Sequence, residues 1–252
     1  MENRHKKILE ILNQKKQVKV NYLSKVLNTS TVTIRKDLKL LEKKKLLFRT
    51  HGGASLESPF VNDKSVNEKE FINAAEKAAI GRKAAQLIQD DQYIILASGT
   101  SILAMARYIN PLKKLTVVTS ALNVALELTN KENIEILQLG GYIRPNSYSV
   151  IGHYSEMILK EIACSKLFLG VDGIDLEYGL STTNALEAHL NQQMIEASKE
   201  VIVLVDSTKF NKRSFGRICG LEQVDHIITD SKIPPETARK IKSLGIDLTI
   251  CD

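Results

Sequence analysis

The sequence predicts a chain of two parts, a small helical module with a β wing and then an α/β domain with a doubly wound, mostly parallel Rossmann-like sheet. Three observations predict this arrangement. The basic charge is confined to the first quarter of the 252 residues, apolar residues recur there at helical spacing, and short apolar runs alternate with helix-like stretches in the remainder.

The charge is divided unevenly along the chain. Residues 1–57 hold 14 lysines and arginines against 5 acidic residues, a net charge of +9, whereas residues 58–252 hold 21 against 24, a net charge of −3. A compact positive segment on a nearly neutral body is typical of a module that binds a polyanion, with nucleic acid as the first candidate. A solvated lysine-rich surface is the alternative that charge alone leaves open.

Three groups of apolar residues at helical spacing predict three helices in the first part of the chain. The groups are Ile8, Leu9, Ile11 and Leu12; Val20, Leu23, Val26 and Leu27; and Ile34, Leu38 and Leu41. Turn and N-cap residue types at 28–30 separate the second helix from the third. A strand at 46–50, turned by Gly52-Gly53, then predicts a two-stranded wing. This order is that of a winged helix-turn-helix.

In a winged helix-turn-helix the third helix lies in the DNA major groove, and its first residues reach the base edges. Arg35 suits bidentate contact to guanine, and the wing suits the DNA backbone or the minor groove. The predicted DNA-binding residues are Ser30, Thr31, Thr33, Arg35, Lys36, Lys39, Arg49 and His51. The alternative is that Arg35 and Lys36 are ordinary surface charges and that Asp37 pairs with a neighbouring lysine.

The segment from 54 to about 69 has little periodicity and many polar residues. We therefore predict domains at 1–57 and 71–252, with a linker at 58–70 between them. A long helix at about 71–89 leads to seven apolar runs, which are YIILA, LTVVT, IEILQLG, KLFLGV, VIVLV, DHIIT and IDLTI. Strands that alternate with helices imply a parallel sheet with helices on both faces.

Small, hydroxyl-bearing and charged residues follow five of the predicted strands. In open α/β sheets, ligands bind beyond the carboxyl ends of the strands. A Ser-Gly-Thr-Ser loop that enters a helix favours a phosphate, while a lysine or arginine supplies countercharge and Asp172 accepts sugar hydroxyls. The predicted ligand-binding residues are Ser98, Gly99, Thr100, Ser101, Ser120, Gly140, Gly141, Arg144, Asp172, Gly173 and Lys209. Each alone is also compatible with ordinary turn or N-cap chemistry.

Cys164, Cys219 and Cys251 are odd in number, far apart and without CxxC spacing, so neither a disulfide framework nor a zinc site is expected. We expect no metal and no cofactor. The N-terminus lacks the apolar core of a signal peptide, and no apolar run approaches the length that spans a membrane. A cytoplasmic protein without a membrane partner is expected.

The stretch TVTIRKDLKLLEKKKLLFRTHGGA resembles the signature of the DeoR family of bacterial transcriptional repressors. LGG-x-x-R-P, LGVDGID, GLST and DSTKF resemble the sugar-phosphate-sensing domain of that family, which is similar in fold to sugar-phosphate isomerases such as ribose-5-phosphate isomerase. Some positions depart from the family pattern, among them Ser120-Ala121 in place of the usual Asn-Ser. Lys36 replaces the commoner second arginine and loses the guanidinium fork, and Ala97 stands where the family usually has an aspartate.

The resemblance implies a repressor of a sugar-utilisation operon whose affinity for a double-stranded DNA operator is controlled by a phosphorylated sugar. It is expected to act as a homodimer or homotetramer and not as an enzyme. The alternative is a sugar-phosphate isomerase or deaminase with a DNA-binding appendage, for which Asp172, Glu187 and Lys209 are the candidate bases. An RNA-binding module is less well supported, because stacking aromatic residues are scarce beyond Phe48.

Overall fold

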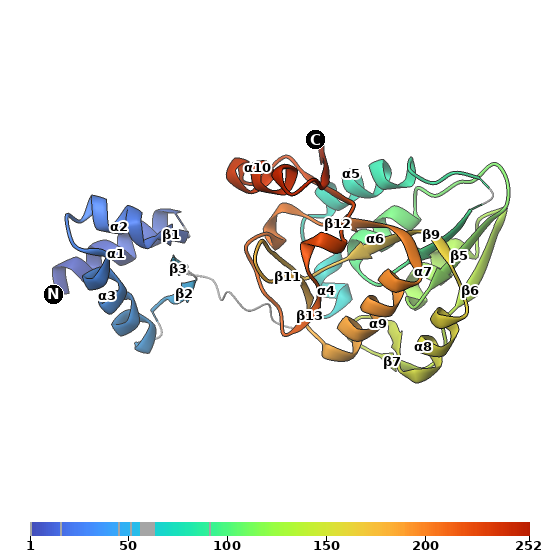
Figure 1. Cartoon of the computed structure of the whole chain (residues 1–252), viewed down its shortest axis with the longest axis horizontal. Helices are drawn as coiled ribbons and strands as arrows, with labels where there is room; N and C mark the ends of the chain where they lie inside the picture. The colour runs from blue at the N-terminus through green and yellow to red at the C-terminus, as the bar shows by residue number, and fades with distance from the viewer. Residues whose placement is uncertain (1, 16, 45, 51, 56–63, 91) are drawn as a thin grey trace. The chain divides into compact units, whose positions relative to one another are not determined.

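The protein was analysed as a computed structural model that describes residues 2–15, 17–44, 46–50, 52–55, 64–90 and 92–252. The chain divides into two compact units, one of residues 1–60 and one of residues 61–252 (Figure 1). Each unit has its own apolar core.

The N-terminal unit consists of three helices and a small antiparallel sheet. The helices are α1 (Glu2–Lys15), α2 (Val20–Val26) and α3 (Thr31–Lys43), and the strands are β1 (Gln17–Lys19), β2 (Phe48–Thr50) and β3 (Gly53–Ser55). The sheet order is β1-β3-β2, so the wing has one strand more than the two predicted. Only the middle residue of β1, Val18, is buried. One apolar residue gives no periodic signal, which is why the sequence did not indicate this strand.

A buried carboxylate joins two helices of this unit. Asp37 lies three residues after Ile34 on the buried face of α3 and is only 2% exposed. Its carboxylate accepts hydrogen bonds from Arg4 on α1, at 2.5 Å to Nε and 3.0 Å to Nη2, and lies 3.0 Å from Nε2 of His5. Asp37 therefore pairs across the helices, and the alternative pairing with a neighbouring lysine is wrong.

These partners set the protonation of Asp37. Burial raises the pKa of the carboxyl group, but the hydrogen bonds and charges of Arg4 and His5 outweigh burial and leave that pKa below its usual value. The carboxylate is thus ionised at neutral pH, and it ties α3 to α1.

The C-terminal unit is built on a seven-stranded parallel sheet with the order β15-β14-β12-β9-β4-β5-β6. All seven apolar runs of the sequence form strands of this sheet, as predicted. The strands are β4 (Tyr93–Leu96), β5 (Leu115–Thr119), β6 (Ile134–Gln138), β9 (Cys164–Gly170), β12 (Ser198–Leu204), β14 (His226–Asp230) and β15 (Asp247–Cys251).

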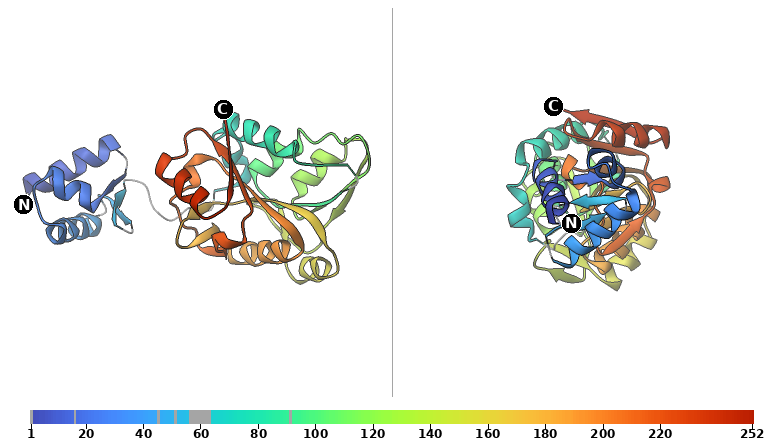
Figure 2. Two further views of the ribbon diagram at one scale, coloured as in Figure 1. Left: turned by 45° about the horizontal axis from the view of Figure 1, so that its top comes forward. Right: turned by 90° about the vertical axis from the view of Figure 1, so that its left-hand side faces the viewer.

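Helices cover both faces of the sheet (Figure 2). One apolar cluster joins the sheet to α5 (Ala74–Ala85), α6 (Thr100–Ala106) and α7 (Leu122–Leu128). The other cluster joins it to α8 (His153–Lys160), α9 (Ala185–Glu196) and α10 (Pro235–Ser243). Neighbouring residues of one strand enter opposite clusters, as Ile94 and Ile95 of β4 do, because successive side chains of a strand point to opposite faces.

Smaller elements follow the carboxyl ends of the large sheet. One group is an antiparallel sheet of β10 (Gly173–Asp175), β11 (Gly179–Thr182) and β13 (Gly216–Cys219), and another is the hairpin of β7 (Tyr142–Arg144) and β8 (Ser149–Ile151). The 3-10 turns η1 (Ser207–Lys209) and η2 (Leu221–Gln223) complete the unit.

The predicted linker at 58–70 differs from the structure at its C-terminal end. Residues 58–63 lie outside the described residues, but Val66–Glu70 form a short helix, α4. Ser65 caps this helix by accepting a hydrogen bond from the Glu68 amide, and Glu68 reaches back to the Ser65 amide in a capping box. The apolar pattern of five residues is too short to predict a helix, although the cap motif is present in the sequence.

The three cysteines are buried as free thiols in the C-terminal unit. Burial raises the pKa of Cys164 to about 11 and, with a smaller effect of Glu222, that of Cys219 to about 12. Their thiols are therefore protonated and unreactive at neutral pH. Among the described helices, none combines the length and the apolar character needed to cross a bilayer.

Replacing Asp37 with Asn removes the charge that Arg4 and His5 stabilise. We expect Asp37→Asn to lower the free energy of unfolding of the N-terminal unit by about 1.5–3 kcal/mol at pH 7, measured by urea titration with the α3 amide NMR signals as probe. Because the folded-state pKa is lowered, this contribution is complete above pH of about 4 and is lost as the pH falls below it. The two proteins should therefore become equally stable in acid.

The matched control is Glu42→Gln, which removes an exposed carboxylate from the same helix. Exposed pairs contribute about 0–1 kcal/mol, so this variant should unfold almost as the unmodified protein does. An equal loss from both substitutions would contradict the special role of Asp37.

Candidate functional site

The hydroxyls at the start of α3 form the helix cap. Ser30 Oγ accepts a hydrogen bond from the Thr33 amide at 3.2 Å and lies 2.9 Å from Thr33 Oγ1. Thr31 is the first residue of the helix and is half-buried. Ser30 and Thr33 thus fix the N-terminus of α3, and their oxygens lie where a neighbouring phosphate would meet the positive end of the helix.

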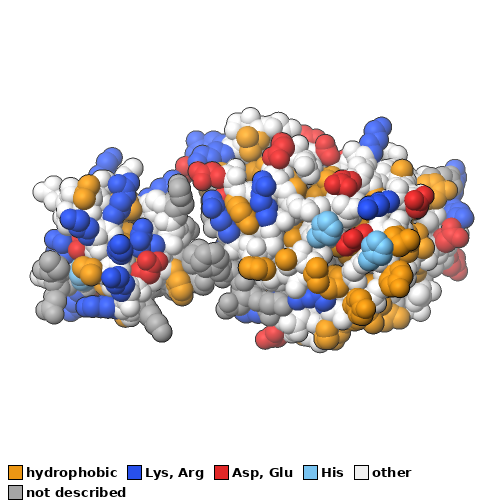
Figure 3. All heavy atoms as spheres, turned by 60° about the horizontal axis from the view of Figure 1, so that its bottom comes forward, with side chains coloured by type: hydrophobic (Ala, Val, Ile, Leu, Met, Phe, Trp, Pro, Cys, Tyr) orange, Lys and Arg blue, Asp and Glu red, His pale blue; other side chains and the backbone are white. Residues whose placement is uncertain are grey.

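The predicted cations of α3 lie on its exposed face. Arg35, Lys36 and Lys39 are exposed, whereas Ile34 and Leu38 on the opposite face enter the core of the unit. Lysine and arginine side chains crowd the surface of the N-terminal unit, at the left of Figure 3. The face of α3 is therefore free to carry positive charge into a groove of DNA.

Two wing residues, Arg49 and His51, were predicted to bind DNA, and the structure describes Arg49. Arg49 on β2 lies 3.7 Å from Glu42 of α3, measured from Nη1 to Oε2, and both side chains are about two-fifths exposed. A surface pair of this kind contributes little stability, about 0–1 kcal/mol. His51 lies outside the described residues.

A polar cavity lies at the carboxyl ends of β4, β9 and β12 in the C-terminal unit. The empty space at this site is about 660 Å³, a figure that includes open solvent at its mouth. Six of the predicted ligand-binding residues line it, namely Ser98, Gly99, Thr100, Ser101, Asp172 and Lys209. Gly99 has φ of +128°, a conformation that a glycine adopts easily, and it turns the chain from β4 into α6.

The other five predicted residues do not line this cavity. Ser120 and Gly140 follow β5 and β6, the last two strands at one edge of the sheet. The Ser120 carbonyl accepts a hydrogen bond from the Val150 amide, and the Gly140 carbonyl accepts one from the Ser155 hydroxyl. Gly141 and Gly173 lie where a Cβ would meet backbone oxygens at 2.4 and 2.6 Å, so close packing explains them. Arg144 does not line the cavity but forms an ion pair with Glu187, which does.

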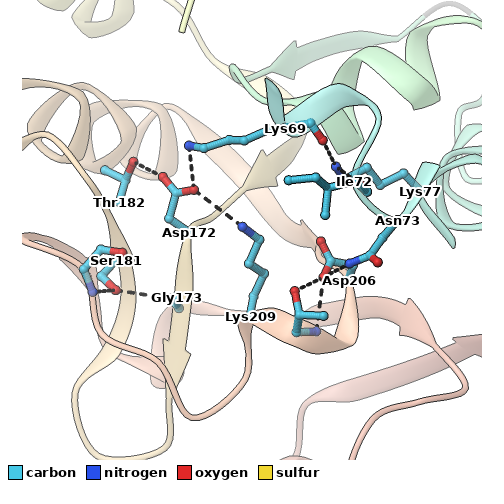
Figure 4. A network of polar contacts seen from close by, with 12 residues as sticks. Lys69, Ile72, Asn73, Lys77, Asp172, Gly173, Ser181, Thr182, Asp206 and Lys209 are labelled. Carbon is cyan, nitrogen blue, oxygen red and sulfur yellow. Dashed lines mark hydrogen bonds and ion pairs between the residues drawn. The ribbon is translucent and has the colours of Figure 1, made fainter. Parts of the chain in front are cut away.

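Three side chains from different parts of the chain contact the carboxylate of Asp172 in the cavity (Figure 4). Its Oδ1 lies 2.9 Å from Lys69 Nζ and 3.8 Å from Lys209 Nζ, and its Oδ2 accepts a hydrogen bond from Thr182 Oγ1 at 3.1 Å. Burial raises the pKa of Asp172, but the two lysines and the bond from Thr182 outweigh burial and lower it below its usual value. The group is therefore a fixed negative charge and a weak base.

A second carboxylate and a buried lysine lie beside this group. Asp206 accepts hydrogen bonds from the Asn73 side chain and the Thr208 amide, both at 3.1 Å. Lys77 of α5 is buried, and its Nζ donates to the carbonyls of Lys69 and Ile72 at 2.5 and 2.7 Å. Burial lowers the pKa of Lys77 to about 8, so this ammonium stays mostly protonated at neutral pH.

Glu187 also lines the cavity, and three side chains hold its carboxylate. Its carboxylate pairs with Arg144 at 2.5 Å, accepts a hydrogen bond from Ser147 at 2.5 Å and also accepts one from Ser149. The network joins the β7–β8 hairpin to α9. Because Arg144 balances the charge of Glu187, this carboxylate is held as a structural group.

Sequence reasoning missed several of the lining residues. Asp206 and Thr182 belong to the motifs DSTKF and GLST and Thr183 follows the second of them, but none was assigned to the ligand site, whereas Lys69 fell in the predicted linker. For Lys77 the sequence did contain a signal that could have indicated its role. It shares helical spacing with the buried residues Ile80, Gly81 and Ala84, and a lysine on a buried helix face is unusual enough to indicate a function.

The cavity favours an anion that also carries hydroxyl groups. With Glu187 balanced by Arg144, the lining holds three ammonium groups, of Lys69, Lys77 and Lys209, against the two carboxylates of Asp172 and Asp206. This excess positive charge suits a phosphate, and the carboxylates suit hydroxyl donors.

Comparison with known proteins relates both units to one family. Residues 4–60 match the DeoR-like helix-turn-helix domain, and residues 72–231 match the DeoR C-terminal sensor domain. Ribose 5-phosphate isomerase A from Methanocaldococcus jannaschii aligns over 55% of each chain, at 16% identity and a TM-score of 0.40.

Curated relatives match along almost the whole chain. A putative aga operon transcriptional repressor of Escherichia coli O157:H7 is 38% identical over 98% of this chain and 93% of its own length. The lactose phosphotransferase system repressor of Staphylococcus epidermidis is 32% identical over 94% of both chains. With a helix-turn-helix, a sensor domain and relatives of this extent, the chain belongs to the DeoR family of transcriptional regulators.

Proposed function

We propose that this regulator represses a sugar-utilisation operon and that a phosphorylated sugar controls its affinity for DNA. The observation that carries the proposal is the cavity at the carboxyl ends of β4, β9 and β12, which offers ammonium groups for a phosphate and carboxylates for hydroxyls on the same chain as an exposed basic helix. Two relatives support the biological context, because they are named as repressors of an aga operon and of a lactose phosphotransferase system.

In the proposed DNA complex, α3 enters the major groove and β2 lies near the backbone. Arg35 contacts guanine through two parallel hydrogen bonds, whereas Lys36 and Lys39 contact phosphates as point charges. One module covers only a short half-site, so a homodimer or homotetramer in the cytoplasm would bind repeated half-sites. Basic residues gather on the N-terminal unit, which supports this mode.

In the proposed ligand complex, the phosphate lies between Lys209 and the Ser98–Ser101 loop, where Thr100 donates its hydroxyl. Asp172 and Asp206 accept hydrogen bonds from the sugar. The ligand acts by binding one arrangement of the oligomer better than another, because only a differential affinity can shift such an equilibrium.

The isomerase alternative is not favoured. Abstraction of a proton next to a carbonyl needs a base with a pKa near the working pH, and the pKa of Asp172 is instead lowered by its cationic partners. Glu187 is balanced by Arg144. The curated relatives are named as regulators, in agreement with this chemistry.

The DNA-binding residues are tested by paired substitutions in α3. We expect Arg35→Ala to cost roughly 1–3 kcal/mol at the operator and to relax the base preference, because a bidentate base contact is lost. Lys36→Ala should weaken binding to all sequences about equally. Gel-shift titrations on promoter fragments measure both effects, with Lys160→Ala on α8 of the other unit as the control for charge loss.

A protein without residues 1–57 should lose its affinity for duplex DNA in the same assay. Undiminished binding by this shortened chain would place the DNA site elsewhere. A selective loss from Lys36→Ala with a uniform loss from Arg35→Ala would instead reverse the two roles.

The ligand site is tested by Thr100→Ala and Lys209→Ala. A thermal-shift screen of sugar phosphates first identifies the compound that stabilises the folded protein. Loss of one charge-assisted bond costs on the order of 1.5–3 kcal/mol, about 10- to 150-fold in ligand affinity. We expect both variants to need that much more of the compound to change operator binding in fluorescence anisotropy, while binding without ligand barely changes.

Lys160→Ala again serves as the control, because this exposed lysine lies on α8 and does not line the cavity. If both site variants respond at the concentration that suffices for the unmodified protein, the phosphate binds elsewhere. Conversion of the compound to a product would restore the enzyme alternative.

A further inference from the structure

The short helix α4 is the first described element after β3 along the chain, and its residues Val66 and Lys69 line the ligand cavity. β3 of the DNA-binding unit ends at Ser55 and α4 begins at Val66. The Val66 amide donates to the Asn146 carbonyl at 2.6 Å, and both residues line the cavity. The cavity therefore borders on the N-terminal end of α4.

Two ammonium groups of the cavity fix the C-terminal turn of α4 (Figure 4). Lys69 of α4 is joined through its side chain to Asp172, and its main-chain carbonyl accepts a hydrogen bond from Lys77 Nζ. The same carboxylate also attracts Lys209 from the end of β12. The docking of α4 thus depends on charges that face the space where the ligand would bind.

Lys69 and Asp172 can each exchange the other for a group of the ligand. The side chains are 20% and 13% exposed, so each reaches the cavity without unfolding its surroundings. A phosphorylated sugar presents both replacements at once, since its phosphate accepts from an ammonium and its hydroxyls donate to a carboxylate. Exchange of partners leaves neither charge unpaired, which keeps its cost low.

The helix itself does not depend on the Lys69–Asp172 pair. The capping box of Ser65 and Glu68 satisfies its first turn locally, and Glu70 pairs with Arg107 at 2.6 Å. Release of Lys69 would therefore change the docking of α4 without unfolding its first turn.

We propose that Lys69 binds the phosphate of the ligand directly and that this contact couples occupancy of the cavity to the docking of α4. The inference rests on the proposed function of the cavity. It adds a ligand-binding residue outside the sheet and names the helix through which the bound state reaches the connecting segment.

Hydrogen exchange of the full-length protein, followed by mass spectrometry during a titration with inorganic phosphate, tests the proposal. In the unmodified protein, phosphate should slow exchange in the Ser98–Ser101 loop and, over the same concentration range, change exchange in the peptide that contains α4. In Lys69→Ala, protection of the loop should need at least about ten times as much phosphate. Exchange in the α4 peptide should no longer change with phosphate.

Two further variants separate the causes. Lys69→Arg keeps the charge and should restore the response of α4, whereas a purely steric role of the lysine would not be rescued in this way. Lys83→Ala removes an exposed lysine of α5 outside the cavity and should behave as the unmodified protein.

The outcomes distinguish the two proposals. Loop protection without any response of α4, or with equal phosphate affinity in Lys69→Ala, overturns the role of Lys69 and leaves the proposed function intact. Absence of loop protection in the unmodified protein rejects the cavity as a phosphate site, and with it the coupling through Lys69.

Discussion

The carboxylate of Asp172 is the constraint on which the ligand cavity depends. It stands at the end of the central strand β9, and two lysines from distant parts of the chain converge on it, one on α4 and one in η1. A buried carboxylate is costly unless cations and hydrogen bonds compensate it. The contacts that compensate Asp172 therefore bring three segments around the cavity. These are α4 through Lys69, β11 through Thr182, and the turn after β12 through Lys209.

The same principle operates in the DNA-binding unit on a smaller scale. Asp37 occupies a position on the buried face of α3, and Arg4 and His5 from α1 compensate its charge. This pairing fixes the orientation of α3 relative to its supporting helix. The exposed cations Arg35, Lys36 and Lys39 are thereby presented together on the other side of α3.

Much of the fold followed from local patterns in the sequence. All seven runs of the large sheet and the three N-terminal helices were predicted, because their apolar residues repeat at the spacing of a strand or helix over enough residues. β1 and α4 were missed, since three and five residues carry too little periodicity. These two elements form because partners elsewhere in the chain supply their contacts, Ala54 for β1 and Asn146 for α4.

The sequence by itself determined the order of the three N-terminal helices and of the seven strands of the large sheet, the basic first quarter and the loops at the strand ends, since each depends on residues close together in the chain. The tertiary structure decided which loops share a cavity. Strand order places β4, β9 and β12 side by side and leaves β6 at the edge, so Ser98, Asp172 and Lys209 converge while Gly140 does not. It also brought Lys69 to that cavity, because its ion pair with Asp172 across 103 residues of chain leaves no local pattern.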